Sequence, residues 1–561
     1  MRKSIRRSLP EIIFFCVAFT VISLILRSRY SLFSEALGSF FLTFGLHFSY
    51  WSGFNRSLAV FAAEFLITIP VFLIARYVCS IQKNAGKRKL IPFLIPVIFS
   101  LAMLAVLCEL QVFRRDDFWE VQYSHDLGLF KFIALVFRTE GGRYFSYFLK
   151  GLGAFFPTAE PVMIYMNTCL VISLLALLMG IYRLILFLIK TSASAGQSVS
   201  EKKTAFLFAF CLFTAFIFTA PKFWEDWCWD AAGLIFGIGV SLSVWSLALV
   251  MEDVLYHTDR MNNVILPSLI LILACGCNQI TTIAIDILIT EALLYVFISR
   301  RNTLIRRRVF YYFAVAAAAS VICLLAPGNF YRLEKSPFDY PSLSEAASTM
   351  KQMIIRIYQQ ISVNVLMMKS YWIILIVTCL LFGSMMTLRN KKRIILLSLG
   401  MIPAGFFSLS LNYLIDYMPS RVYAAAFIWF AFTAALLSIT AGSLFHDLLR
   451  DSVLPVRIRS AYVFLAVLAS FCPIFLLYHD NHQLLLDIRS AWFYRDEQIR
   501  SLPAGKDQTR RICGVPVVET NGTDIKLAEA FIANYYGLGW VEDTGVCPPF
   551  TPVSDDPTLW R

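Results

Sequence analysis

Apolar runs close to the length of a membrane-spanning helix recur along almost the whole chain, and short basic clusters separate them. A helix needs about 20 predominantly apolar residues to cross a bilayer. The composition agrees, because 58% of the 561 residues are hydrophobic, only 16% are charged, and the mean hydropathy is +0.67. Such values are not those of soluble globular proteins. The sequence therefore predicts an all-α polytopic membrane protein and excludes a soluble multidomain chain.

The basic clusters orient the predicted spans. We expect about 13 spans, with every second loop rich in Lys and Arg, which is typical of cytoplasmic loops. The N-terminus is then cytoplasmic, and an odd number of spans places the C-terminus outside. The net charge of +13 reflects this topology, so we expect no nucleic-acid partner. The spans are predicted over 10–26, 58–80, 91–110, 160–189, 204–220, 232–251, 263–276, 280–299, 309–326, 366–387, 394–412, 421–443 and 460–478.

Two segments expected outside the cytoplasm are too long for simple turns. The segment 111–159 contains two stretches, 127–137 and 144–156, whose pattern predicts amphipathic helices lying on the membrane. The segment 327–365 opens with Ala326-Pro327-Gly328-Asn329, which predicts a turn followed by a similar surface helix.

The end of the chain is more polar. Residues 479–561 predict a small extracytoplasmic α+β domain, with a helix through 482–500, a strand over 511–519 and a short helix over 525–536.

The first long outer segment carries the acidic motif Arg114-Arg115-Asp116-Asp117-Phe118-Trp119-Glu120. Adjacent carboxylates repel each other, so Asp116 and Asp117 favour a shared proton or a bound divalent cation such as Mg²⁺ or Mn²⁺. Either Asp can also serve as a general base for an acceptor hydroxyl. Trp119 and Glu120 are candidates for binding a sugar. The alternative interpretation is a solvated charged loop.

Two further outer segments combine groups that can bind a sugar. Trp224, Glu225 and Asp226 lie in a cluster of Trp and acidic residues, where a sugar ring can stack and form hydrogen bonds; the alternative is an aromatic belt at the headgroup level. Asn278 and Gln279 form a polar reversal between two spans. They are predicted to point into a cavity or to cap a helix.

Three outer arginines are candidates for binding the phosphate of a donor, because guanidinium groups bind phosphate in a bidentate manner. They are Arg143, which follows Glu140-Gly141-Gly142, and Arg332 and Arg421, which follow Pro-containing turns. The alternative is anchoring at lipid headgroups. Within the spans, the acids Glu64, Glu109, Asp286 and Glu291 are costly unless they face a cavity or a partner, so each is also a candidate site.

Four short motifs, in this order and on this side of the membrane, resemble the GT-C superfamily of membrane glycosyltransferases. They are Asp116-Asp117-Phe118, Gly142-Arg143-Tyr144, Ala326-Pro327-Gly328-Asn329 and Ala533-Asn534-Tyr535-Tyr536-Gly537. The chain looks like a bacterial branch of that superfamily. The resemblance implies a GT-C-like transmembrane core over 91–478, preceded by two extra spans within 1–90 and followed by the small domain at 479–561.

The resemblance also implies an activity in the bacterial cytoplasmic (inner) membrane. The donor would be a sugar on a polyprenyl phosphate or pyrophosphate, and the acceptor an extracytoplasmic glycan, lipid or protein. Asp116 or Asp117 would act as general base or metal ligand. Two alternatives stay open: a polymerase or ligase of lipid-linked glycans, which would depend more on the outer arginines, and a flippase or transporter of lipid-linked sugars, which would use the intramembrane acids.

Overall fold

The computed structural model describes most of the chain from residue 91 onward. The described residues are 91–112, 115–156, 159–192, 199–219, 233–256, 264–299, 303–334, most of 351–363, 369–384, 388, 391–409, 420–448, 456–501, 509–514 and 540–546. The two spans predicted within 1–90, together with Glu64, lie outside the described residues.

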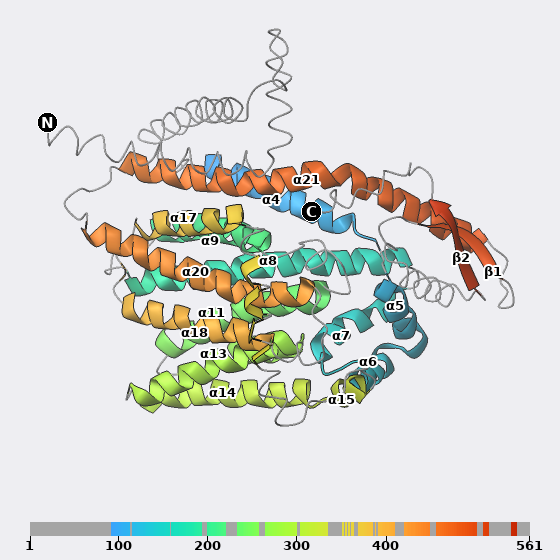
Figure 1. Ribbon diagram of the computed structural model, residues 1–561, viewed down its shortest axis with the longest axis horizontal. Helices are drawn as coiled ribbons and strands as arrows, with labels where there is room; N and C mark the ends of the chain where they lie inside the picture. The colour runs from blue at the N-terminus through green and yellow to red at the C-terminus, as the bar shows by residue number, and fades with distance from the viewer. Residues whose placement is uncertain are drawn as a thin grey trace, which may run out of the picture.

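Long helices that run roughly parallel to one another form the body of the molecule (Figure 1). Backbone amides in a bilayer must be satisfied internally, and helices do this within a single segment. The helices are α4 (Ile91–Glu109), α8 (Ala159–Ser192), α9 (Val199–Thr219), α11 (Ile238–Tyr256) with the preceding π-helical turn η5 (Gly233–Gly237), α12 (Ile265–Cys275), α13 (Gln279–Ile298), α14 (Thr303–Leu324), α17 (Lys369–Gly383), α18 (Lys391–Ser408), α20 (Ser420–Leu448) and α21 (Val456–Ser501).

Among the described residues, 5 helical stretches are long and apolar enough to cross a membrane. They are Glu160–Leu188, Gly233–Val254, Gln279–Ile298, Thr303–Leu324 and Ala425–Phe445. Shorter apolar helices, among them Ile95–Glu109 and Ala205–Thr219, pack beside them. The protein is thus a helical membrane protein, and each span predicted from 91–110 to 421–443 coincides with a helix.

Short helices gather at one end of the bundle, which we call the site end: the end where α12 and α14 finish and α13 begins (Figure 1). They are α5 (Arg115–Leu127), α6 (Leu129–Thr139), α7 (Tyr144–Gly151), the 3-10 turn η3 (Leu152–Phe155) and α15 (Pro327–Glu334). Helices α6 and α7 confirm that the stretches 127–137 and 144–156 are helical.

Two polar segments for which no helix was predicted are helical. Residues 115–120 of the acidic motif form the first turns of α5, where the partial positive charge of the helix N-terminus favours carboxylates such as Asp116 and Asp117. The predicted turn at Pro327 is the start of α15, because proline fits the first position of a helix, where no intrahelical N–H bond is lost.

At the end of the chain, the last predicted span and the helix predicted over 482–500 form one continuous helix, α21, which crosses the expected domain boundary at residue 478. Strand β1 (Thr509–Gly514) overlaps the predicted strand and pairs in parallel with β2 (Trp540–Val546). The rest of that strand and the helix predicted over 525–536 lie outside the described residues.

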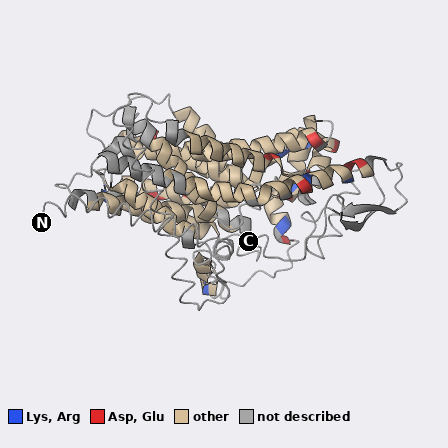
Figure 2. Cartoon of the chain, turned by 90° about the horizontal axis from the view of Figure 1, so that it is seen from above, with Lys and Arg blue, Asp and Glu red and all other residues tan. Residues whose placement is uncertain are grey.

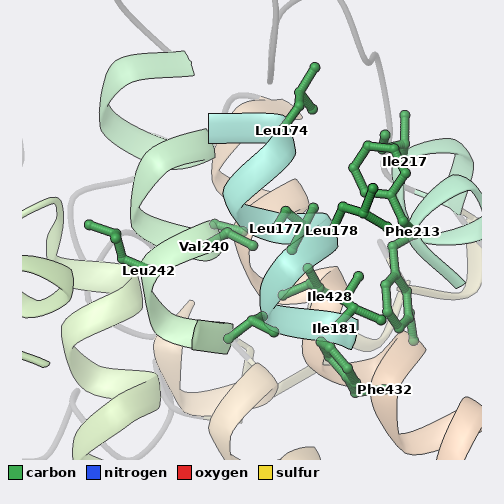
Figure 3. Close-up of a cluster of buried hydrophobic side chains, with 14 of the residues drawn as sticks. Leu174, Leu177, Leu178, Ile181, Phe213, Ile217, Val240, Leu242, Ile428 and Phe432 are labelled. Atoms are coloured by element: carbon green, nitrogen blue, oxygen red, sulfur yellow. The ribbon is translucent and has the colours of Figure 1, made fainter. Parts of the chain in front are cut away.

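Close side-chain packing joins the long helices. Figure 3 shows Leu177 and Ile181 of α8 beside Phe213 of α9, Val240 of α11 and Phe432 of α20, all of them buried. Lipid tails are as apolar as these side chains, so van der Waals packing rather than exclusion of water favours this association. Among the described residues, charges are few along the middle of the bundle and gather toward the site end (Figure 2).

A buried ion pair joins α11 and α14 at the end opposite the site end. Arg308 Nη1 lies 2.5 Å from Asp253 Oδ2, and the Tyr312 hydroxyl donates to the same oxygen at 2.8 Å. Both charges are almost completely enclosed, so the pair satisfies groups that would be costly alone.

Helices α17 and α20 cross closely because each has a glycine at the contact. A Cβ at Gly383 would overlap the carbonyl of Ile439, and one at Gly442 would overlap the carbonyl of Leu380. Small residues at a crossing let two membrane helices approach backbone to backbone.

We therefore expect Gly442→Val to separate α17 from α20 and to lower the free energy of unfolding by about 1–3 kcal/mol, the usual cost of overpacking. Thermal melting in detergent micelles measures the effect. The matched control is Ala434→Val on the partly exposed side of the same helix. Equal destabilisation by both variants would show that the glycine contact has no special role.

Candidate functional site

The connection between α6 and α7 fits the site end only because it contains two glycines. Gly141 adopts a φ of 132°, which other residues rarely adopt. A Cβ at Gly142 would overlap the carbonyl of Cys323, at the end of α14. Gly328, near the start of α15, in turn lies against the backbone of Glu140 and Gly141. The Glu140-Gly141-Gly142 connection is thus clasped between α14 and α15.

Helix α7 is fixed on the turn between α12 and α13. The backbone N–H of Phe145 donates to Gly276 O at 2.9 Å, and the Tyr144 hydroxyl donates to Ile272 O at 2.6 Å. Ser146 Oγ lies within hydrogen-bonding distance of two carbonyls, Leu234 O at 2.9 Å and Cys277 O at 3.0 Å. These bonds hold the beginning of α7, and Arg143 just before it, at a defined place on the helix ends.

A chain of side-chain hydrogen bonds starts at Arg143. Its Nε donates to Gln279 Oε1 at 3.3 Å, and Gln279 Nε2 donates to Asn329 Oδ1 at 2.7 Å. Asn329 Nδ2 then donates to the carbonyls of Cys323 and Leu324, at 2.8 and 3.0 Å. Three motifs far apart in the sequence therefore meet at one point.

Arg332 lies on the other side of the same connection. Its Nη1 donates to Glu140 O at 3.3 Å and is 3.9 Å from Glu140 Oε2. Both of these side chains are more than a third exposed, so the ion pair is weak and leaves Arg332 accessible. Arg143 and Arg332, which we call the arginine pair, thus lie at the two ends of the Glu140-Gly141-Gly142 connection, which is the glycine turn of the site.

The acidic face of α5 packs toward α7. Asp117 and Glu120, three positions apart, share one side of the helix and both are buried. Glu120 forms an ion pair with Lys150 in the last turn of α7, with Lys150 Nζ 2.5 Å from Oε2 and 2.6 Å from Oε1. Glu120, predicted to bind a sugar, thus has an internal partner. Trp119 is half-buried and packs edge to face with Tyr123.

Tyr147 connects the two groups of charges. It is buried one turn into α7, and this burial is the main reason that its pKa rises to about 12; Arg143, Glu120, Glu140 and Arg332 also act on its charge. The phenol therefore stays neutral at physiological pH, and the Lys150 ammonium lies over its ring, 5.9 Å from the centroid.

The other predicted site residues are placed as follows. Asn278 caps α13: its Oδ1 accepts from Thr281 N at 2.9 Å and its Nδ2 donates to Ile235 O at 2.8 Å, which is the capping alternative. Asp286 accepts from Ser320 Oγ at 2.8 Å, and Glu291 lies against Gly400.

Several predicted site residues fall outside the part of the chain that the structure describes. These are Trp224, Glu225 and Asp226, and the side chains of Asp116 and Arg421. Within the described residues, no group of three or more His, Cys, Asp or Glu side chains is placed to hold a metal ion.

Sequence reasoning did not assign a role to Asn329, although it singled out the motif that contains it. It also gave Lys150 no role. A lysine between apolar residues in a short outer helix is a signal that could have been used, because a buried charge requires a partner. The identity of that partner depends on how α5 and α7 pack.

Comparisons of the chain with models of protein families, with curated proteins and with solved structures find no match. The site's interpretation therefore depends on its own geometry.

The buried pair of Lys150 and Glu120 gives a stability prediction. Lys150→Met leaves the Glu120 carboxylate buried without its cation, so we expect a loss of about 3–5 kcal/mol in unfolding free energy. The double variant Lys150→Met/Glu120→Leu removes both charges and should recover most of that loss. Unfolding by SDS in mixed micelles measures both, with Lys131→Met on the exposed side of α6 as control. Additive losses in the double variant would contradict a direct pairing.

Proposed function

We propose that this protein is a membrane glycosyltransferase with a GT-C-like architecture, which moves a sugar from a polyprenyl-phosphate or polyprenyl-pyrophosphate donor to an extracytoplasmic glycan, lipid or protein. The observation that carries the proposal is the arginine pair. Arg143 and Arg332 come from segments far apart in the chain and flank one glycine turn at the site end. Guanidinium groups in such a place suit a phosphate group.

The length of α7 relates the arginine pair to the acidic helix. Arg143 immediately precedes this helix, and Lys150, which binds Glu120, lies in its last turn. Seven residues of helix rise by about 10 Å. A lipid-linked sugar whose phosphate lies on the arginine pair can therefore extend its ring toward α5 and its carboxylates.

The transfer follows from these groups. Asp116 or Asp117 takes the proton of the acceptor hydroxyl, and the hydroxyl oxygen forms a bond to the anomeric carbon of the donor. The bond between that carbon and the phosphate oxygen breaks, and its electron pair leaves with the lipid phosphate. Arg143 and Arg332 stabilise the negative charge of this leaving group.

We also propose a membrane topology for the chain. It has about 13 spans, a cytoplasmic N-terminus, the site end outside a bacterial cytoplasmic membrane, and an extracytoplasmic α+β domain at residues 479–561. Basic loops alternate along the sequence in support of this orientation.

The rival functions depend on different groups. A polymerase or ligase of lipid-linked glycans would share the arginine pair but would depend less on the carboxylates of α5. A flippase would use intramembrane acids such as Asp286, whose hydrogen bond to Ser320 gives it a local structural partner. The geometry favours the transferase because the acidic helix and the arginine pair lie at opposite ends of one short helix.

The activity can be tested with the full chain reconstituted in proteoliposomes. The vesicles would contain polyprenyl-phosphate and polyprenyl-pyrophosphate sugars, and mass spectrometry would follow release of the sugar and appearance of the glycosylated acceptor. We expect Asp116→Asn/Asp117→Asn to lower kcat about 10²- to 10⁴-fold, the usual contribution of a general base. The single variants assign the base to one carboxylate.

Asp126→Asn is the matched control, since Asp126 is exposed near the other end of α5. Full turnover in the double variant would remove the carboxylates from the mechanism and favour the polymerase or ligase. If the wild type releases no sugar but moves the sugar-lipid across the vesicle membrane, and Asp286→Asn abolishes that movement, the protein is a transporter instead.

A further inference from the structure

We propose that Gln279 and Asn329 are positioning residues that fix the Arg143 guanidinium for bidentate binding of a phosphate group. This inference rests on the proposed function and extends it, because it gives Gln279 a different role from the sugar contact predicted from the sequence. It also brings Asn329 into the site.

Gln279 contacts the Nε edge of the Arg143 guanidinium. A guanidinium is a planar fork with five N–H donors, one of them on Nε. Gln279 Oε1 accepts the hydrogen bond from Nε. This contact fixes the plane of the fork while the two terminal amino groups stay available for the paired hydrogen bonds that phosphate oxygens accept.

The hydrogen bonds from Arg143 to the end of α14 can run in one direction only. The last carbonyls of a helix have no partner within the helix. At the end of α14, the carbonyls of Cys323 and Leu324 accept from the Asn329 amide nitrogen, so Asn329 must present its oxygen to Gln279. Gln279 therefore donates through its own nitrogen and presents its oxygen to Arg143. Reversing either amide would place two acceptors or two donors against each other. The end of α14 thus sets the orientation of Arg143.

Helix ends hold Gln279 and Asn329 in place. Gln279 is the first residue of α13, and the side chain of Asn278 caps that helix immediately before it. Asn329 belongs to the first turn of α15. A Cβ at Gly141 would overlap Asn329 Oδ1 and approach Gln279 Nε2, so the glycine lets the connection close over both amides. Three helix ends and one turn therefore hold the two amides in place.

Gln279→Glu is the informative substitution. It keeps the size of the side chain and an oxygen for Arg143 Nε, but it adds a negative charge that competes with phosphate and removes the donor to Asn329. A purely structural role for Gln279 would change stability without changing selectivity for phosphate. A positioning role weakens binding of the phosphate and leaves binding of the lipid tail unchanged.

The experiment measures binding to the purified full chain in detergent micelles by isothermal titration calorimetry. Three probes are compared: farnesyl phosphate, farnesol and inorganic phosphate. We expect the wild type to bind farnesyl phosphate more tightly than either other probe, which distinguishes a lipid-linked phosphate from free phosphate and from the tail alone. Gln279→Glu and Asn329→Ala should each weaken farnesyl phosphate binding about tenfold or more. This is the effect of losing one of the two charge-assisted hydrogen bonds between a misplaced Arg143 and the phosphate. Binding of farnesol should not change.

A double-mutant cycle with Arg143→Lys tests the coupling directly. Lysine has no Nε fork for Gln279 to orient, so Gln279→Leu should weaken farnesyl phosphate binding in the wild-type background and have little further effect in the Arg143→Lys background. The matched control is Gln483→Leu, an exposed glutamine of α21 that bonds Asp487. Melting temperatures show that each variant is folded.

The possible failures are distinguishable. If Arg143→Lys weakens binding but Gln279→Leu and Asn329→Ala do not, or if the two effects simply add, the positioning role is wrong and the phosphate site remains. If neither the wild type nor any variant prefers farnesyl phosphate to farnesol, both the positioning role and the phosphate site of the proposed function are wrong.

Discussion

The rest of this structure depends on one constraint, which is that a backbone inside a bilayer must satisfy its own hydrogen bonds. The constraint produces long helices, and it also concentrates every unsatisfied backbone group at the helix ends. At the site end, those groups are met by side chains from other segments: Asn329 binds the last carbonyls of α14, and Asn278 caps α13. The polar site is therefore a direct consequence of where the apolar helices stop.

Charge is distributed around α7 in a way that separates two kinds of chemistry. Lys150 at the end of this helix neutralises Glu120, whereas Arg143 before its beginning is held by a neutral amide. A neutral partner orients a guanidinium without cancelling its charge, so Arg143 keeps its attraction for an anion. Lys150, paired with a carboxylate in a buried place, contributes to the packing of α5 on α7 instead. Two cations at opposite ends of one short helix thus have different roles because their partners differ.

The sequence predicted the helices well and their connections less well. Apolar length alone located the helices from 91–110 to 421–443, because a helix that crosses a bilayer needs a long apolar run. No helix was predicted for the acidic motif, yet its residues 115–120 begin α5. Neither helix propensity nor charge shows whether a polar segment has another helix to pack against. Arg143, Gln279 and Asn329 were all noted for their side of the membrane, but Gln279 was assigned to a sugar and Asn329 to no role. Hydrogen-bond partners more than a hundred residues apart leave no local pattern.

By itself, then, the sequence determined that the protein is helical and membrane-embedded, and which polar segments interrupt the apolar runs, because both follow from the cost of placing polar groups in hydrocarbon. Only the tertiary structure decided that the glycine turn, the start of α13 and the start of α15 meet, and that Arg143 bonds an amide while Lys150 bonds a carboxylate. Those outcomes depend on steric contacts between distant backbones, such as Gly142 against Cys323, and helix packing sets them rather than the residues on either side.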